Sequence, residues 1–292
     1  MPDSHVMRLS AFGAVMEIAC RDPDARAACM DALPAYWQRA DGAAPDVRFA
    51  IEPSGPARGG AARFQLLEAG TPRANDITLA QVARLLAQRM DYQLGAYARG
   101  CAFIHAGVVL HEGRALLFPG TSHAGKSTLT AALVRAGATY VSDDVAVIGR
   151  DGRVSLLSRA LTLRADMAGD FHLPDAGGAA VLHPGSPPVG AVLVLTYRAG
   201  APPLDLRPLS AGEAVLRLVA NAMNARHQPE EVLQCCAAAL ALAWCGEGVR
   251  GDADAAAGQI LSRMTHARPA LDHPPAQDRP VLDPRGRTGG DL

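Results

Sequence analysis

A single lysine constrains this chain more than any other residue. Lys126 is the only lysine among the 28 basic side chains of the sequence, and all the others are arginine. It lies in residues 120–127, which read G-x-x-x-x-G-K-S and which we call the 120–127 motif. This pattern is typical of a glycine-rich loop whose backbone N–H groups wrap phosphates. A compact ammonium can reach between two phosphates where a planar guanidinium is too broad, so the lysine indicates chemistry rather than composition.

The 120–127 motif predicts a nucleotide site built from one turn and the start of a helix. The positive end of that helix would point at the phosphates. Lys126 is expected to contact the β- and γ-phosphates of ATP, and the Ser127 hydroxyl to ligate Mg²⁺. The predicted nucleotide contacts are therefore Gly120, Thr121, Ser122, His123, Ala124, Gly125, Lys126, Ser127 and Thr128.

An acidic pair follows the motif closely. Asp143 and Asp144 come 16 and 17 residues after Ser127, at the edge of the apolar run 145–148. Adjacent side chains on a regular strand point to opposite faces, so only a bulge or a strand end would bring both carboxylates to the phosphates. One could then hold Mg²⁺ while the other accepts a proton. The alternative is a solvated strand end.

The strand that enters the motif is predicted to be the second arm of a hairpin. Residues 101–110 and 115–119 are apolar and flank a tight turn at 111–114, so antiparallel pairing is expected. His105 would lie on the first arm, beside the motif. A lone histidine in an apolar strand is commonly a satisfied core residue, and its position here favours a functional role.

Taken together, these residues resemble the HPr kinase/phosphorylase family over about residues 100–220. The order His105-x-Gly107, the 120–127 motif and then Asp143-Asp144 is most similar to the kinase-like relatives, which include kinases that tailor lasso peptides. The resemblance implies a P-loop kinase core of the HPr kinase/phosphoenolpyruvate carboxykinase type with a mixed sheet. It also implies that His105 polarises Asp143 as the base toward a serine hydroxyl, and that Asp144 helps to hold the metal.

Arginine is the usual partner of the charge that develops on a transferred phosphoryl group. Arg164, at the end of a predicted strand over residues 160–164, is the candidate, and Arg159 is the second. A plain surface position is the alternative for both.

The chain as a whole is expected to be an α/β protein in three parts. Residues 1–75 form a small N-terminal α/β module, residues 76–265 form the kinase-like domain, and residues 266–292 form a disordered tail. A long amphipathic helix is predicted over 77–97 and a strand over 138–148. The last third is predicted to be helical, with a capping box at Ser210 and Glu213 and helices over 210–223, 229–244 and 252–264.

Composition narrows the possible partners and compartment. Formal charge is −1 without a basic, aromatic-rich patch, so nucleic acid is excluded. No apolar run is long enough to span a membrane, and the N-terminus lacks the features of a signal peptide. The six cysteines show no C-x-x-C spacing and indicate a reduced, cytoplasmic protein. A homo-oligomer is compatible with the sequence.

The function predicted from these features is an ATP-dependent serine kinase. It would move the γ-phosphoryl group of ATP, with Mg²⁺, to a hydroxyl of a protein or peptide acceptor. Lys126, Asp143, His105 and Arg164 would be the catalytic residues, with Ser127 and Asp144 on the metal. A nucleotide-sensing binding module and a slow ATPase without a phospho-acceptor are the alternatives.

Overall fold

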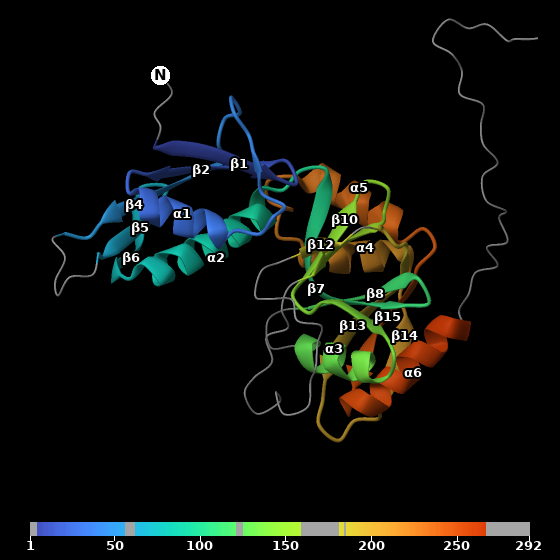
Figure 1. Ribbon diagram of the computed structural model, residues 1–292. Coiled ribbons are helices and arrows are strands. Elements are labelled where there is room, and N and C mark those ends of the chain that lie inside the picture. Colours follow the sequence, from blue (N-terminus) through green and yellow to red (C-terminus); the bar gives the residue numbers. More distant parts are fainter. Residues whose placement is uncertain (1–4, 56–61, 121–124, 159–180, 184, 267–292) are drawn as a thin grey trace, which may run out of the picture.

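Two mixed β-sheets and six helices make up the part of the chain that the structure describes (Figure 1). The structure is a computed structural model, and it describes residues 5–55, 62–120, 125–158, 181–183 and 185–266. The α/β class and the mixed sheet predicted from the sequence are confirmed. The predicted tail, residues 266–292, lies outside the described residues except for His266.

The first sheet belongs to the N-terminal unit. Its strand order is β3-β1-β2-β4-β5-β6, with β2 and β4 parallel and the other neighbours antiparallel. Along β2, alternate side chains are buried, so one face of the sheet is apolar. The strands are β1 (Val6–Ala11), β2 (Ala14–Cys20), β3 (Gln38–Arg39), β4 (Val47–Pro53), β5 (Phe64–Glu68) and β6 (Thr71–Ile77).

Two helices cover the apolar face of this sheet. Helix α1 (Pro23–Asp31) begins where the Asp22 side chain accepts a hydrogen bond from Ala25 N at 2.8 Å. Helix α2 (Leu79–Tyr97) begins at a reciprocal capping box between Thr78 and Gln81. The buried side of α2 joins the same core as the sheet. The sequence places residues 76–97 in the second domain, whereas α2 packs with the sheet of the N-terminal unit.

The second sheet carries the candidate site. Its order is β12-β11-β10-β7-β8-β13-β15-β14, and β9 also pairs with β7. Strands β8, β13 and β15 are parallel, whereas β7 is antiparallel to β8, as the hairpin prediction required. The strands are β7 (Cys101–His111), β8 (Arg114–Pro119), β9 (Thr139–Ser142), β10 (Val145–Gly149), β11 (Val154–Ser158), β12 (Val181–His183), β13 (Val189–Tyr197), β14 (Leu204–Pro208) and β15 (Trp244–Arg250).

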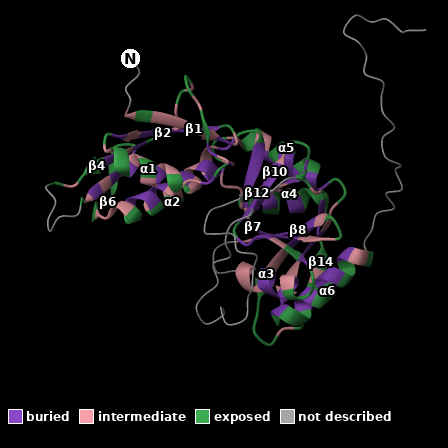
Figure 2. Cartoon of the chain, viewed as in Figure 1, coloured by how far each residue is buried: buried purple, intermediate pink, exposed green. Residues whose placement is uncertain are grey.

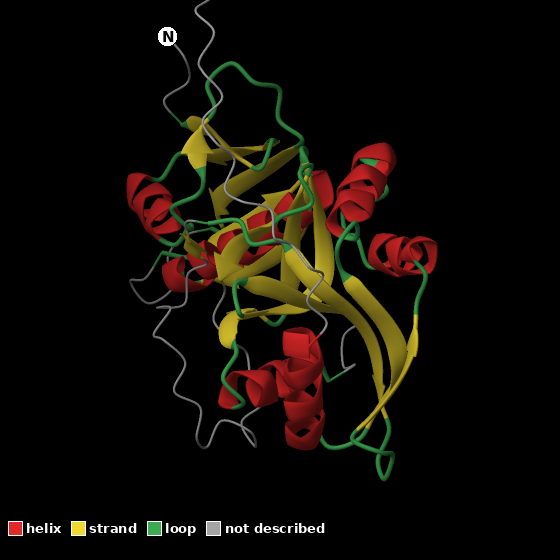
Figure 3. Cartoon of the chain, turned by 90° about the vertical axis from the view of Figure 1, so that its right-hand side faces the viewer, coloured by secondary structure: helices red, strands yellow, loops and turns green. Residues whose placement is uncertain are grey.

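Helices flank this sheet on both faces, as Figures 1 and 3 show. Helices α3 (Lys126–Arg135) and α6 (Ala253–His266) pack on one face, and their buried residues form one cluster with β8 and β13. Helices α4 (Ala211–Ala220) and α5 (Pro229–Ala239) pack on the other face, in a second cluster. The predicted capping box at Ser210 and Glu213 is confirmed at the start of α4.

The C-terminal third is less helical than predicted. The helix expected over 229–244 ends at Ala239, and Trp244–Arg250 is strand β15, paired with β13 and β14. Gly246 and Gly248 give this segment a weak strand pattern. A Cβ on Gly248 would lie 1.9 Å from Asp205 O of β14, so the close backbone pairing itself requires glycine there.

The two units share buried residues. Phe103, Val145 and Val147 of the second sheet belong to the same apolar cluster as the N-terminal sheet and α2. Figure 2 colours the buried parts of the chain purple, and they occur in the strands of both units. The rings of Phe12 and Phe103 meet edge to face, with centroids 5.3 Å apart. The units are therefore joined by core packing as well as by the chain. Over the described residues, no helix has the length and apolar character needed to cross a bilayer.

Candidate active site

The 120–127 motif joins the end of β8 to the start of α3. Strand β8 ends at Pro119, and α3 begins at Lys126 with Gly125 as its N-cap in the left-handed conformation, φ 80°. This φ favours glycine over any residue with a Cβ. Lys126 and Ser127 therefore occupy the first turn of a helix, where the backbone N–H groups are free of helical partners. Residues 121–124 lie outside the described part of the chain.

The register of β7 brings His105 to the motif. His105 pairs with Val145, the first residue of β10, while its neighbour Ala106 pairs with Pro119, the last residue of β8. The histidine thus lies between the acidic pair and the motif. Lys126 Nζ is 3.0 Å from His105 Nε2 and donates to Gly120 O at 2.9 Å. Burial lowers the pKa of Lys126, and the charges of Asp144 and Asp143 act against this.

The acidic pair lies in the two-residue gap between the end of β9 and the start of β10. Both strands pair with β7 in succession, and Asp143 and Asp144 occupy the gap between them. The buried Ser142 hydroxyl accepts from the N–H groups of Asp144 and Val145, at 3.2 and 3.1 Å. This local turn replaces ladder bonds, so the predicted continuous strand over 138–148 is two strands. The strand end anticipated as a way to present both carboxylates is therefore present.

Asp143 contacts the first turn of α3. Its Oδ2 accepts a hydrogen bond from Ser127 Oγ at 2.5 Å, and its Oδ1 accepts one from Tyr140 OH at 3.4 Å. The residue is only 8 % exposed. Burial raises the pKa of Asp143, the nearby charge of Asp144 adds to the rise, and the Ser127 hydrogen bond opposes it. A cation placed at this carboxylate would relieve the cost of its buried charge.

Asp144 contacts the His105 ring. His105 Nδ1 lies 3.1 Å from Asp144 Oδ1 and 2.9 Å from Asp144 O. Because Nδ1 faces two acceptors and Nε2 faces the Lys126 ammonium, a neutral ring with its proton on Nδ1 satisfies every contact. The resemblance implied that His105 acts on Asp143. In the structure, His105 contacts Asp144, whose side chain is 54 % exposed and accessible to an acceptor.

The Phe118 ring explains why position 107 of the His105-x-Gly107 pattern is a glycine. Gly107 pairs with Phe118 across the β7–β8 hairpin, and a Cβ at position 107 would lie 2.0 Å from the Phe118 ring. The ring therefore lies across the glycine, directly before the motif. Any larger residue at position 107 would displace it.

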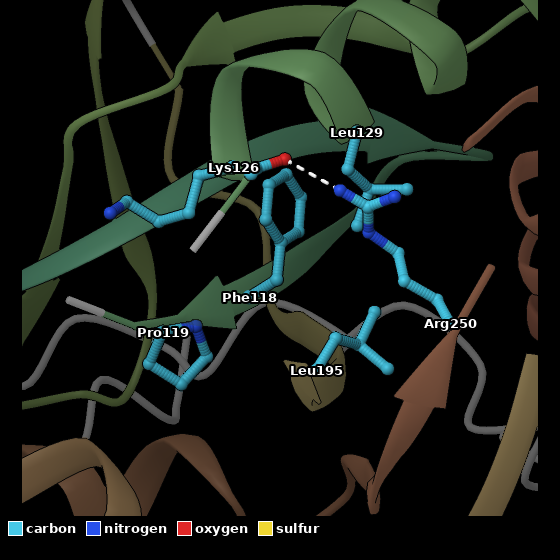
Figure 4. A pocket seen from close by; sticks show the side chains of 7 residues that line it. Phe118, Pro119, Lys126, Leu129, Leu195 and Arg250 are labelled. Atoms are coloured by element: carbon cyan, nitrogen blue, oxygen red, sulfur yellow. Dashed lines mark hydrogen bonds between the residues drawn. The ribbon is translucent and has the colours of Figure 1, made fainter. Parts of the chain in front are cut away.

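Sequence reasoning missed Arg250. This last residue of β15 is 3 % exposed, and its Nη2 donates to Gly125 O at 3.0 Å (Figure 4, dashed line). It is 125 residues from Gly125 in the sequence and is one arginine among many, so no local signal singled it out. The arginines that we proposed instead, Arg159 and Arg164, lie outside the described residues. Arg250 is one of seven residues that line a cleft, and the others are Phe118, Pro119, Gly125, Lys126, Leu129 and Leu195.

The side chains offer few ligands for a metal ion. No group of three or more His, Cys, Asp and Glu side chains with metal-binding geometry occurs among the described residues. Mg²⁺ at nucleotide sites usually takes only one or two protein ligands and keeps waters and phosphate oxygens. The Ser127 hydroxyl and the Asp143 carboxylate, already in contact, suit that pattern.

Comparison of this chain with protein-family models, with curated proteins and with solved structures gave no match.

Proposed function

We propose that this protein is an ATP-dependent serine kinase, which transfers the γ-phosphoryl group of ATP to a serine hydroxyl of a protein or peptide. One observation carries the proposal. Lys126 and Ser127 lie on the first turn of α3, and each is linked to one of the two aspartates. Ser127 bonds directly to Asp143, whereas Lys126 contacts His105, which in turn contacts Asp144. A donor site and a proton acceptor thus adjoin each other.

The contacts favour a division of roles opposite to the one we inferred from the resemblance. Asp143 is buried against the Ser127 hydroxyl, and a carboxylate beside the motif serine is the usual second ligand of the nucleotide's Mg²⁺. Asp144 is exposed and steadied by the Nδ1–H of His105. We therefore assign the metal to Ser127 and Asp143, and the role of base to Asp144.

The proposed reaction needs little covalent work from the protein. Lys126 exchanges its bonds to Gly120 O and His105 for phosphate oxygens, and the N–H groups of the first turn hold the phosphate chain. Asp144 accepts the proton of the acceptor serine hydroxyl while the serine oxygen forms a bond to the γ-phosphorus. The bond from that phosphorus to the β–γ bridging oxygen breaks, and ADP leaves. Mg²⁺, when bound, neutralises charge on the phosphate oxygens.

Labelled ATP provides the test. The protein is incubated with γ-labelled ATP, Mg²⁺ and peptide libraries centred on serine, threonine or alanine, and the modified residue is then identified. We expect label on serine, lost in the Lys126→Arg variant and absent from the alanine library. Label released only as inorganic phosphate, at a rate that peptides do not change, would favour the slow ATPase. Binding of ATP without loss of label would favour the nucleotide-sensing module.

A further inference from the structure

Arg250 is a buried cation that has no carboxylate in contact within the described part of the chain. Its guanidinium is 3 % exposed and donates to two backbone carbonyls, Gly125 O at 3.0 Å and Gly251 O at 3.1 Å. Among the described residues, no carboxylate lies within salt-bridge distance of it. A guanidinium carries five N–H donors, so two bonds to neutral carbonyls leave much of its binding capacity unused.

The position of this cation is set by three parallel strands. The carboxyl ends of β8, β13 and β15 meet at the first turn of α3, and this edge of a parallel sheet is where ligands usually bind. Arg250 ends β15, and its guanidinium lies 5.1 Å from the ring centroid of Tyr197, the last residue of β13. In Figure 4 the Lys126 side chain points away from Arg250, so the two cations flank the turn on different sides.

Burying an unpaired cation costs free energy, and a protein gains nothing from it by folding alone. Burial lowers the pKa of Arg250 although Tyr197 and Asp252 act to raise it. The N–H···O bond to Gly125 could be supplied by a neutral side chain. A positive charge retained beside a phosphate-binding turn is instead explained by an anion that binds there.

We propose that Arg250 is the second cation of the nucleotide site and that its counter-ion is the phosphate chain of the nucleotide. The inference rests on the proposed function, since it takes the 120–127 motif to bind nucleotide phosphates. Arg250 supplies charge from the cleft side of α3, while Lys126 supplies it from the side of the acidic pair. Arg250 thus takes the phosphate-binding role that the sequence prediction gave to Arg164.

Calorimetric titration with ADP·Mg²⁺ and with pyrophosphate·Mg²⁺ separates this role from a structural one. Pyrophosphate has the phosphate chain and no base or ribose, so a phosphate contact must affect both probes. The variants are Arg250→Met, which removes the charge, and Arg250→Lys, which keeps it. Arg263→Met is the matched control. Arg263 is an exposed residue of α6, and its guanidinium lies over the ring of Trp244, which begins the strand that Arg250 ends.

We expect Arg250→Met to raise the Kd of both probes at least about tenfold, without lowering the melting temperature of the ligand-free protein. Arg250→Lys should recover a large part of the affinity, and Arg263→Met should match the wild type. The inference is overturned if Arg250→Met binds both probes as the wild type does, if the loss is confined to ADP, or if both Arg250 variants lose affinity equally. If the wild type binds neither ADP nor ATP, the proposed function fails and the inference falls with it.

Discussion

Asp143 and Asp144 are neighbours in the chain, yet they have different surroundings. Asp143 is buried against Ser127 and Tyr140, whereas Asp144 is exposed beside His105. The difference arises because the Ser142 hydroxyl turns the backbone between β9 and β10. Two identical side chains can therefore perform different tasks.

Magnesium titration of the transfer rate tests this division. Asp143→Asn should raise the Mg²⁺ concentration needed for half-maximal rate by about tenfold or more, because it removes the charge of a hard oxygen ligand. Asp144→Asn should lower the maximal rate by about a hundredfold or more with little change in the Mg²⁺ requirement, because it removes the base. The reverse pattern would restore the assignment drawn from the resemblance.

Glu68 is a buried charged residue of the N-terminal unit, outside the candidate site. It is 2 % exposed and accepts from Arg89 at 2.6 and 2.9 Å, from Arg73 at 3.0 Å and from Gln93. Burial acts to raise the pKa of Glu68, but the hydrogen bonds from Arg89 and Gln93 outweigh it, and the pKa is lowered. The stabilisation is thus present above the unfolded pKa and lost as pH falls through the folded one.

Glu68→Gln should lower the free energy of unfolding by about 3 kcal/mol at pH 7, since it leaves Arg89 without its partner. The difference from the wild type should begin to shrink as pH falls to the unfolded-state pKa of a glutamate, about 4, and should vanish only as pH falls through the lowered folded-state pKa of Glu68. Urea denaturation at several pH values measures both effects. Glu52→Gln, an exposed residue of β4 bonded by Gln65, is the control and should change stability by less than about 0.5 kcal/mol. A difference that stays constant with pH would mean that the charge of Glu68 does not stabilise the fold.

At the scale of elements, β7 organises the site. It pairs with β8, β9 and β10, so one strand sets the positions of the motif, the acidic pair and His105. The sequence predicted the β7–β8 hairpin and the start of helix α3 because each combines a strong local pattern with a clear turn or cap. It missed β15 and Arg250, since glycines weaken that strand's pattern and its pairing with β13 spans about fifty residues. The edge strand β6 contains Pro72, Asn75 and Asp76, and has no strand signal of its own.

Asn224, in the segment that follows α4, hydrogen-bonds to the end of α2 and to β7. The buried side chain donates to Ala98 O at 3.1 Å and to Cys101 O at 2.8 Å, and accepts from Phe103 N at 3.1 Å. Asn224→Ala leaves these three backbone groups unsatisfied and should cost about 3 kcal/mol of unfolding free energy. Asn221→Ala is the matched control, because the exposed Asn221 side chain at the end of α4 donates to Arg217 O, one turn back in the same segment. Equal urea midpoints for the two variants would contradict this role.

At the scale of the whole molecule, the shared core predicts that the two units unfold together. Phe103, Val145 and Val147 contribute to the core of the N-terminal unit, so loss of one unit exposes apolar surface of the other. The chain offers a direct probe, since its two tryptophans, Trp37 and Trp244, lie in different units.

Single-tryptophan variants report each unit separately. Trp244→Phe leaves the probe in the N-terminal unit, and Trp37→Phe leaves it in β15. Within each variant, the fluorescence and far-ultraviolet circular dichroism transitions in urea should coincide, as two-state unfolding requires. A fluorescence midpoint displaced from the circular dichroism midpoint in either variant would show that the units unfold independently.

The rate of γ-phosphoryl loss from ATP tests whether Lys126 acts on the phosphates of ATP. The measurement compares the wild type with Lys126→Arg, with and without the serine acceptor, and uses the melting temperature to check that both proteins are folded. We expect the wild type to transfer the γ-phosphoryl group and Lys126→Arg to be slower by about a hundredfold or more, although the charge at position 126 is conserved. A folded Lys126→Arg protein that turns over ATP at nearly the wild-type rate would contradict this role of Lys126.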